Sequence, residues 1–231
     1  MRIDDYYRLL YRSCPYLILP IRAGELRGML WTLGATEIEA VFGIYEAAQT
    51  RLLGEEIEPT DTAYDIGANV GYYTLLMSKL AKRVLSFEPL PRNLRYLRRH
   101  RLLNLAKNVK IIDKAVSSDN GKIRFFLGEN HAMGHIYTPW TDALKDEFIE
   151  VQQIRLDGSG LPAPDVMKID VEGAELQVLK GAEDTIECYH PTIFLSIHSD
   201  DLRKECTEFL HGLGYNMRPI EGDAGLAYIC R

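Results

Sequence analysis

The sequence predicts an α/β protein with a Rossmann-like, doubly wound, mostly parallel sheet that is finished by an antiparallel strand. Short apolar runs alternate with helical segments through most of the 231 residues, which is typical of a parallel sheet with helices on both faces. Residues 62–74, TAYDIGANVGYYT, give the order strand, glycine-rich turn and helix. The last two apolar runs, 215–220 and 226–230, are joined by a short turn and should therefore pair antiparallel.

Each expected element rests on a local pattern. Strands are expected where apolar and β-branched residues cluster between turn residues: 62–66, 83–87, 109–112, 122–127, 151–156, 165–169 and 192–197. Helices are expected where apolar residues recur at helical spacing: 36–53 with an interruption at Gly43, 72–81, 91–104, 173–181 and 200–213. Pro91 suits the first turn of its helix because the N–H that it lacks would be unpaired there. The turn DNG at 119–121 makes the run KIRFFL after it a hairpin or edge strand.

Two segments show no clear period. Residues 1–35 mix basic and aromatic residues, and we expect them to form a lid or brace on the core, with a membrane-surface helix as the alternative. Residues 128–148 form a long irregular stretch with two histidines, His131 and His135, and a tryptophan. A loop of this length inside an α/β domain is usually functional.

Composition excludes several classes of protein. Hydrophobic residues at 46% and charged residues at 26% are ordinary globular values, and the net charge of −6 gives no footprint for nucleic acid. Four scattered cysteines without a CxxC pair indicate reduced thiols rather than a disulfide framework or a zinc site. The apolar run at 15–21 is too short for a signal peptide or a membrane span. We therefore expect a soluble cytoplasmic protein, and the sequence leaves a homo-oligomer open.

Polar residues at the ends of the expected strands are the candidate site residues. In an open α/β sheet, ligands gather at the carboxyl ends of strands, near the point where the strand order reverses. The residues found there are Asp65 with the glycine turn, Glu88, Asp113, Asp170 with Glu172, and His198. Glu88 is the most informative, because an acid at the tip of the second strand accepts hydrogen bonds from two ribose hydroxyls and repels a 2′-phosphate.

The glycine turn narrows the choice of ligand. Its pattern is Asp65-x-Gly67-x-x-x-Gly71, which is not the GxGxxG of a dinucleotide site, and no lysine of a P-loop follows Gly71. An acid before the first glycine would repel a pyrophosphate but suits a ligand with a positive amino group. S-adenosylmethionine has an ammonium group, a sulfonium and a ribose diol but no phosphate, so it fits these acids.

Four stretches resemble one family. YDIGANVGYYT, FEPLPRN, the AVS stretch at 115–117 and KIDVEGAELQVLKGA are similar to the FkbM-type methyltransferases of the class I, S-adenosylmethionine-dependent superfamily. The resemblance covers about residues 43–198, and KIDVEGAE is its most diagnostic part. It implies a seven-stranded sheet and methyl transfer, most often to a hydroxyl of a sugar, glycolipid or secondary metabolite. We expect a class I methyltransferase domain at 55–231 behind an N-terminal helical extension or lid at 1–54.

The resemblance also assigns cofactor residues. The matching positions of the glycine turn and of the ribose-binding acid are Asp65, Gly67, Ala68, Asn69, Gly71 and Glu88. Asp113 precedes the AVS stretch, where such proteins often contact the adenine. Tyr45 and Glu46 match a position before the glycine turn that could close over the methionine end of the cofactor.

The residues expected to take part in catalysis are Asp170, Glu172 and His198, which follow adjacent strands. His198 is the candidate base because its unperturbed pKa lies near ~6.5. Asp170 is expected to position the cofactor's amino group or the substrate, and Glu172 could instead cap the helix that follows it. Family members often carry Glu two residues before this histidine, and here that position is Ser196, which leaves the base open.

Metal use and the acceptor are less defined. Asp170, Glu172 and Asp200 offer oxygen ligands that suit Mg²⁺, although no metal site is assigned. The acceptor, a small molecule or glycan, should lie against residues 1–35 and 128–148. Two other functions stay open: a catalytically silent binding module that keeps the cofactor fold, and an NAD-dependent reductase.

Overall fold

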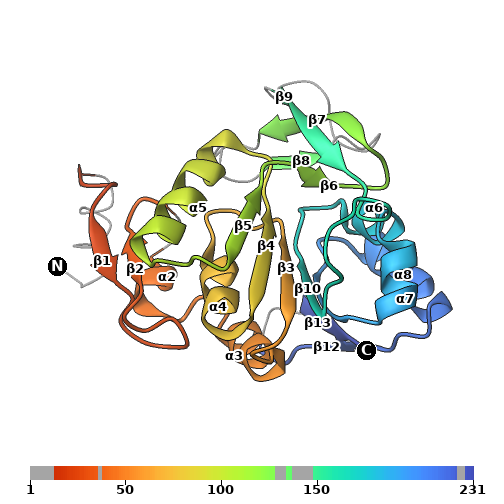
Figure 1. Cartoon of the computed structure of the whole chain (residues 1–231), viewed down its shortest axis with the longest axis horizontal. Helices are drawn as coiled ribbons and strands as arrows, with labels where there is room; N and C mark the ends of the chain where they lie inside the picture. Colours follow the sequence, from red (N-terminus) through yellow and green to blue (C-terminus); the bar gives the residue numbers. More distant parts are fainter. Residues whose placement is uncertain (1–12, 36–37, 128–133, 137–147, 223–226) are drawn as a thin grey trace.

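The central sheet is built from the short apolar strands of the sequence. The computed structural model describes residues 13–35, 38–127, 134–136, 148–222 and 227–231. Within them, seven strands form one sheet (Figure 1): β3 (Thr62–Ile66), β4 (Arg83–Phe87), β5 (Val109–Ile112), β10 (Val166–Ile169), β11 (Thr192–Ser196), β12 (Met217–Pro219) and β13 (Ala227–Cys230). Their order is β12-β13-β11-β10-β3-β4-β5.

The strand order reverses beside β3. The chain runs outward from β3 through β4 to β5, then returns to place β10 on the other side of β3 and β11 beyond it. All of these neighbours are parallel, whereas β13 is antiparallel to both β11 and β12. The expected fold class, with its antiparallel last strand, is confirmed. The carboxyl ends of β3 and β10 lie next to each other, which is where an open α/β sheet binds its ligand.

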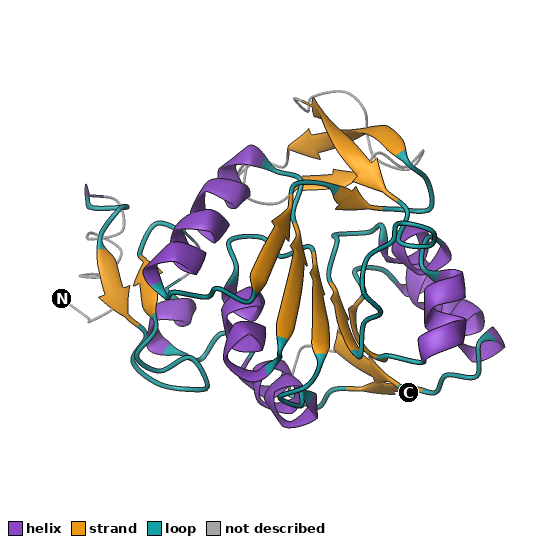
Figure 2. Cartoon of the chain, in the orientation of Figure 1, coloured by secondary structure: helices purple, strands orange, loops and turns teal. Residues whose placement is uncertain are grey.

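Alternation along the strands divides the core in two. Ala63, Val84 and Val166 face one side, where they pack in a cluster with Leu75 and Met77 of α4 (Tyr72–Leu80). The next residue on each strand faces the other side, toward the cluster that contains α6 (Glu175–Lys180), α7 (Glu183–Tyr189) and α8 (Asp200–Gly212). Figure 2 shows these helices in two groups on either side of the strands. Strands that are buried on both faces explain the nearly continuous apolar runs.

A second sheet begins where the central one ends. β6 (Ala115–Val116), β7 (Gly121–Leu127), β8 (Gly134–Ile136) and β9 (Phe148–Ile154) pair in the order β6-β9-β7-β8. The strand expected at 122–127 is β7, and it pairs with both β8 and β9, so it is a hairpin strand and not an edge. The run expected as a strand at 151–156 belongs to this second sheet as β9. Most of the irregular stretch at 128–148, including His131, lies outside the described residues.

The helical segment expected at 36–53 is interrupted at Gly43, as its sequence predicted. The chain forms α2 (Glu39–Phe42) and α3 (Ala47–Glu56), which are separated at Gly43, where φ is 74°. A left-handed residue ends a helix, and glycine adopts it without strain. Two short strands, β1 (Ile18–Pro20) and β2 (Leu30–Thr32), form an antiparallel pair that the sequence did not predict. Helix α7 was not predicted either.

Helix α5 (Pro91–Leu103) holds this N-terminal pair through a buried histidine. The ring of His100 stacks on Trp31 with centroids 4.0 Å apart. Its Nε2 accepts the N–H of Thr32 at 3.0 Å, while Nδ1 lies 2.8 Å from the carbonyl of Val70. Since Nε2 is an acceptor, Nδ1 must carry the hydrogen, and the ring is neutral. Burial lowers the pKa of His100 to about 4.

This histidine should make the stability of the fold sensitive to acid. An unfolded chain protonates His100 near pH 6.5, whereas the folded protein does so near pH 4, so the contribution of His100 is present above pH 6.5 and is lost as the pH falls toward 4. The free energy of unfolding should drop by up to about 1.4 kcal/mol per pH unit in this window. Urea unfolding between pH 4 and 7.5 measures this slope. His100→Gln should flatten it relative to the wild type, and the exposed His211→Gln should not; equal slopes for all three proteins would contradict the assignment.

Candidate active site

The glycine turn after β3 is held against its two neighbouring strands. The N–H groups of Gly67 and Ala68 both donate to the carbonyl of Phe87, at 3.0 and 2.9 Å. Gly67 has φ of 81°, and a Cβ atom there would lie 1.8 Å from the carbonyl oxygen of Asp170. Gly71 has φ of 98° and begins α4. The backbone can follow this path only because both positions lack a side chain.

Asp65 supports the turn from behind. Its side chain is fully buried, Oδ2 accepts the hydroxyl of Thr74 at 2.5 Å, and Thr74 Oγ1 lies 2.9 Å from Ser86 Oγ. Burial raises the pKa of Asp65, although the Lys168 ammonium opposes this shift. The sequence suggested that this acid faces a positive ligand group directly. The structure instead places it below the turn, outside the wall of the cavity described next.

A cavity of about 730 Å³ opens above the turn, at the carboxyl ends of the strands. Its walls come from the segment before α3, the glycine turn, the residues that follow β4, β10 and β11, and parts of β6 and β7. Gly71 does not line the cavity. The predicted site residues that do are Tyr45, Glu46, Gly67, Ala68, Asn69, Glu88, Asp170, Glu172 and His198. A volume of this size suits a small-molecule or cofactor site.

Glu88 is fixed by the turn and by its own strand end. Its side chain is 4% exposed. Oε2 accepts the N–H of Asn69 at 2.8 Å and Oε1 accepts the N–H of Leu90 at 2.7 Å. Burial raises the pKa of Glu88 to about 8, although these two N–H groups favour the ionised form. Each carboxylate oxygen keeps acceptor capacity for a further donor.

Unpartnered polar atoms also belong to residues of this wall. Asn69 Oδ1 and Gln49 Nε2 are buried and have no hydrogen-bond partner within the part of the chain that the structure describes. A buried polar atom without a partner is costly, so such atoms mark places where a ligand or a water would bind.

The floor of the cavity carries a buried ammonium that sequence reasoning missed. Lys168 lies inside β10, is 3% exposed, and donates from Nζ to Asp170 Oδ2 at 3.0 Å. Burial alone would lower its pKa, but Asp170, Asp65 and Glu46 outweigh burial and raise it. The same ammonium holds the pKa of Asp170 below its ordinary value, against the effect of burial. A lysine within the apolar run VMKI was the signal that could have identified it.

Glu46 approaches this group from the N-terminal side. It has φ of 41° and precedes α3, and its Oε2 accepts the Tyr73 hydroxyl at 2.6 Å. The Lys168 ammonium lies 4.5 Å from the centre of the Tyr73 ring, a cation–π distance. Glu46 therefore lies on the cavity wall beside Lys168 and Tyr73, and its contact with the methionine end of the cofactor stays a prediction.

Asp170, Glu172 and His198 come together as the sequence predicted. His198 Nε2 lies 3.7 Å from Asp170 Oδ1 and 3.5 Å from Glu172 Oε2. His198 Nδ1 lies 3.1 Å from Oε1 of Glu175, a fully buried residue that sequence reasoning missed. The contact with Glu175, together with the charges of Glu172 and Asp170, raises the pKa of His198 to about 9. An imidazolium cannot accept a proton, so the base role predicted for His198 requires the neutral ring.

Glu175 also takes over the capping role that Glu172 was considered for. Its Oε1 accepts the N–H of Gly173 at 3.1 Å and that of Val171 at 3.4 Å, at the start of α6. Its position in the first turn of the helix was the available signal. Glu172 instead has φ of 54° and directs its carboxylate toward His198.

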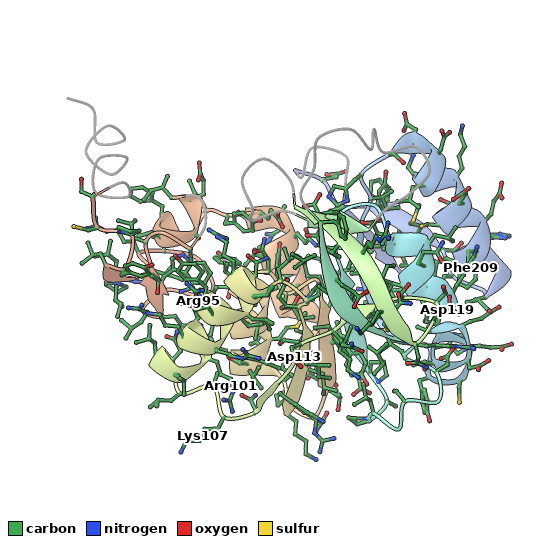
Figure 3. All side chains as sticks on the ribbon, turned by 90° about the horizontal axis from the view of Figure 1, so that it is seen from above. Arg95, Arg101, Lys107, Asp113, Asp119 and Phe209 are labelled. Atoms are coloured by element: carbon green, nitrogen blue, oxygen red, sulfur yellow. The ribbon has the colours of Figure 1, made fainter. Side chains whose placement is uncertain are left out.

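Two other expected positions, Asp113 and Asp200, lie outside the cavity wall. Asp113 lies next to α5 (Figure 3), with Oδ2 3.5 Å from Arg98 Nη2, and the cavity wall begins at the next residue, Lys114. The adenine contact of Asp113 therefore stays a prediction. Asp200, offered as a third Mg²⁺ ligand, is 84% exposed and pairs with Arg203 at 2.7 Å. Ser196 is buried on the cavity wall.

The chain is similar to known methyltransferases. Residues 65–217 match the model of the methyltransferase FkbM domain. The chain is 31% identical over 167 residues to hexuronic acid methyltransferase AglP of Haloferax volcanii, over 69% of this chain and 65% of AglP. It is 28% identical over 154 residues to methyltransferase sdnD of Sordaria araneosa, over 52% of this chain and 60% of that protein. The chain thus aligns with less than two thirds of the length of each relative.

Solved structures share the fold. A methyltransferase FkbM from Methylobacillus flagellatus KT superposes with a TM-score of 0.52 at 19% identity, over 84% of this chain and 55% of that one. Precorrin-6y C5,15-methyltransferase from Geobacter metallireducens GS-15 superposes with a TM-score of 0.51 at 17% identity, over 85% and 92%. At these identities the likeness shows the class I methyltransferase fold.

The close approach at Gly67 can be tested by adding one methyl group. Gly67→Ala should cost about 1–2 kcal/mol for its left-handed backbone and a further 1–3 kcal/mol for the clash with Asp170. Gly158 is a matched control, because its φ is 72° and a Cβ atom added there would meet no described atom within 4 Å. Gly158→Ala should therefore show only the first cost. Urea unfolding measures both, and equal losses would contradict the role of the close approach.

Proposed function

Because the chain belongs to the FkbM methyltransferase family, we propose that it transfers the methyl group of S-adenosylmethionine to a hydroxyl oxygen of a sugar or similar small-molecule acceptor. The observation that carries the proposal is a single cavity that joins the glycine turn and Glu88 to the cluster of Asp170, Glu172 and His198. The first part has the donors and acceptors that a nucleoside requires. The second part offers groups that can receive a proton.

The residues present fit S-adenosylmethionine. Glu88 offers two carboxylate oxygens to a ribose diol, and the atoms without partners at Asn69 and Gln49 can pair with further polar groups of the cofactor. Acids on the wall, among them Glu46 and Asp170, suit an ammonium group and disfavour a pyrophosphate. When bound, the cofactor supplies an electrophilic methyl group. Gly67 lies on the cavity wall without a side chain, whereas a Cβ atom at Gly71 would meet Leu97 of α5 and not the cavity.

The cluster after β10 and β11 handles the acceptor. In-line transfer forms a bond between the acceptor oxygen and the methyl carbon and breaks the bond from that carbon to sulfur. The hydroxyl proton must then leave the oxygen, and a positioned base contributes about 10²–10⁴-fold to such a step. Asp170, Glu172 and His198 present two carboxylates and one imidazole for it, with His198 acting as its neutral form.

A uronic acid sugar is the acceptor class that we propose to test first. Its support is the relative named as a hexuronic acid methyltransferase. No helix in the described part of the chain has the length and apolar character needed to cross a membrane. Cytoplasmic localisation, the division at residue 54, and a small acceptor instead of nucleic acid remain our proposals.

The test separates cofactor binding from transfer. Calorimetry should show one site for S-adenosylmethionine and for S-adenosylhomocysteine, and incubation with methyl-labelled cofactor should label glycans that contain hexuronic acid. Binding of neither cofactor form would reject the enzyme assignment. Binding of NADH with no sulfonium binding would favour the reductase, and binding without transfer to a broad hydroxyl panel would favour the silent module.

Because of Glu88, the protein should bind S-adenosylmethionine more tightly as the pH rises. Ribose hydroxyls bind the ionised carboxylate, whereas the free protein holds a proton there up to about pH 8. The Kd for S-adenosylmethionine should therefore fall as the pH rises from 6 to 8, by up to about tenfold per unit, and level off above pH 8.

Two variants check that this dependence comes from Glu88. Glu88→Gln should bind about 10–100-fold more weakly at pH 8 and lose the slope. Glu183→Gln, at an exposed position on α7, should behave like the wild type. An unchanged slope in Glu88→Gln would place the titrating group elsewhere.

A further inference from the structure

The ring of His198 is oriented by a buried carboxylate. Glu175 Oε1 already accepts two backbone N–H groups, from Gly173 and Val171, and lies 3.1 Å from His198 Nδ1. A carboxylate oxygen can only accept, so Nδ1 must carry the hydrogen of this contact. The other nitrogen, Nε2, then faces the carboxylates of Asp170 and Glu172. A histidine whose far nitrogen is held by a carboxylate is the usual arrangement around a bound metal ion.

The two carboxylates are directed toward the same point. The two oxygens of Asp170 have different neighbours: Oδ2 accepts from Lys168 at 3.0 Å, and Oδ1 is the oxygen nearest His198. Glu172 has a left-handed backbone, φ 54°, and its Oε2 lies near the same ring. One ligand atom from each of the three residues lies within 4.8 Å of the other two.

We propose that Asp170, Glu172 and His198 bind a divalent transition-metal ion, with Mn²⁺ as its representative. Ligand bonds of about 2.1 Å place neighbouring ligand atoms about 3.0–3.4 Å apart, so the separations of 3.5 and 3.7 Å from His198 Nε2 need only small side-chain shifts. The two carboxylates lie within 4.8 Å of each other and would turn toward the ion as it binds. One imidazole and two carboxylates suit Mn²⁺, Fe²⁺ or Zn²⁺ better than Mg²⁺, which prefers oxygen ligands. Glu175 and Lys168 are positioning residues.

A bound ion would also have a role in methyl transfer, and that role rests on the proposed function. Three protein ligands leave coordination positions open toward the cavity, where two neighbouring hydroxyls of a sugar could bind. A hydroxyl bound to a cation loses its proton more readily. With the ion bound, His198 Nε2 would be a ligand and not the base, so the proton would pass to the Glu172 oxygen that is free of the ion, or to water. Binding of the ion itself does not depend on the identity of the methyl donor or acceptor.

The test measures metal binding apart from methyl transfer. The full chain, freed of metal by chelation, is titrated with MnCl₂ and followed by electron paramagnetic resonance. We expect one saturable site, and pulsed spectra of the bound Mn²⁺ should show coupling to a ¹⁴N nucleus, which the wild type can report without any substitution. His198→Ala and Asp170→Asn should weaken binding by more than about 100-fold, and Glu175→Gln by about 10–100-fold.

Two controls distinguish loss of the metal site from loss of folding or of unrelated histidine binding. His211→Ala removes an exposed histidine of α8 and should bind Mn²⁺ like the wild type. Thermal melting without metal shows which variants fold. The proposal is overturned if the wild type has no saturable site for Mn²⁺ or Zn²⁺, if the bound Mn²⁺ lacks ¹⁴N coupling, or if Mg²⁺ binds as tightly as Mn²⁺. Metal binding with no cofactor binding would support this site and reject the proposed function, and cofactor binding alone would do the reverse.

Discussion

The approach of Gly67 to the carbonyl oxygen of Asp170 is the constraint on which the site depends. It joins the end of β3 to the end of β10, at the point where the strand order reverses. Any side chain at Gly67 would force the two strand ends apart. The same turn bonds to Phe87 at the end of β4. Strand pairing brings β4, β3 and β10 side by side, and Gly67 allows the turn between Glu88 and Asp170 to fit there.

The site also depends on a balance between one buried ammonium group and the acids around it. Lys168 places an ammonium beneath the site, and Asp65, Asp170 and Glu46 are the acids whose charges raise its pKa. An isolated buried charge would be very costly, and a group of opposite charges nearby reduces this cost. The arrangement gives the two oxygens of Asp170 different surroundings, because Oδ2 bonds to the lysine while Oδ1 faces His198. The lysine thus determines which atom of the aspartate is available to a ligand.

Much of this arrangement could be predicted from sequence, for identifiable reasons. Strand–helix alternation and the short last turn predicted the sheet, and polar residues at strand ends predicted that Glu88, Asp170, Glu172 and His198 meet. These signals are local in sequence. Because the carboxyl ends of parallel strands lie at the same edge of an open sheet, residues at those ends come together in one site. Lys168 and Glu175 were missed because their roles depend on burial and on partners that are distant in sequence. The role suggested for Asp65 depended on side-chain direction, which its position at the end of a strand does not determine. Helix α7 and the β1–β2 pair are short, and short elements carry weak periodicity.

Ser196 can now be interpreted through its surroundings. The family resemblance of the sequence implied a glutamate at this position, two residues before the histidine. In this chain, three carboxylates, those of Asp170, Glu172 and Glu175, already lie within 3.7 Å of the His198 ring. Ser196 is buried at the end of β11, so a carboxylate there would add negative charge at low dielectric beside this group. The serine therefore removes one acid without leaving His198 unpartnered. It also leaves a smaller and neutral side chain on the cavity wall.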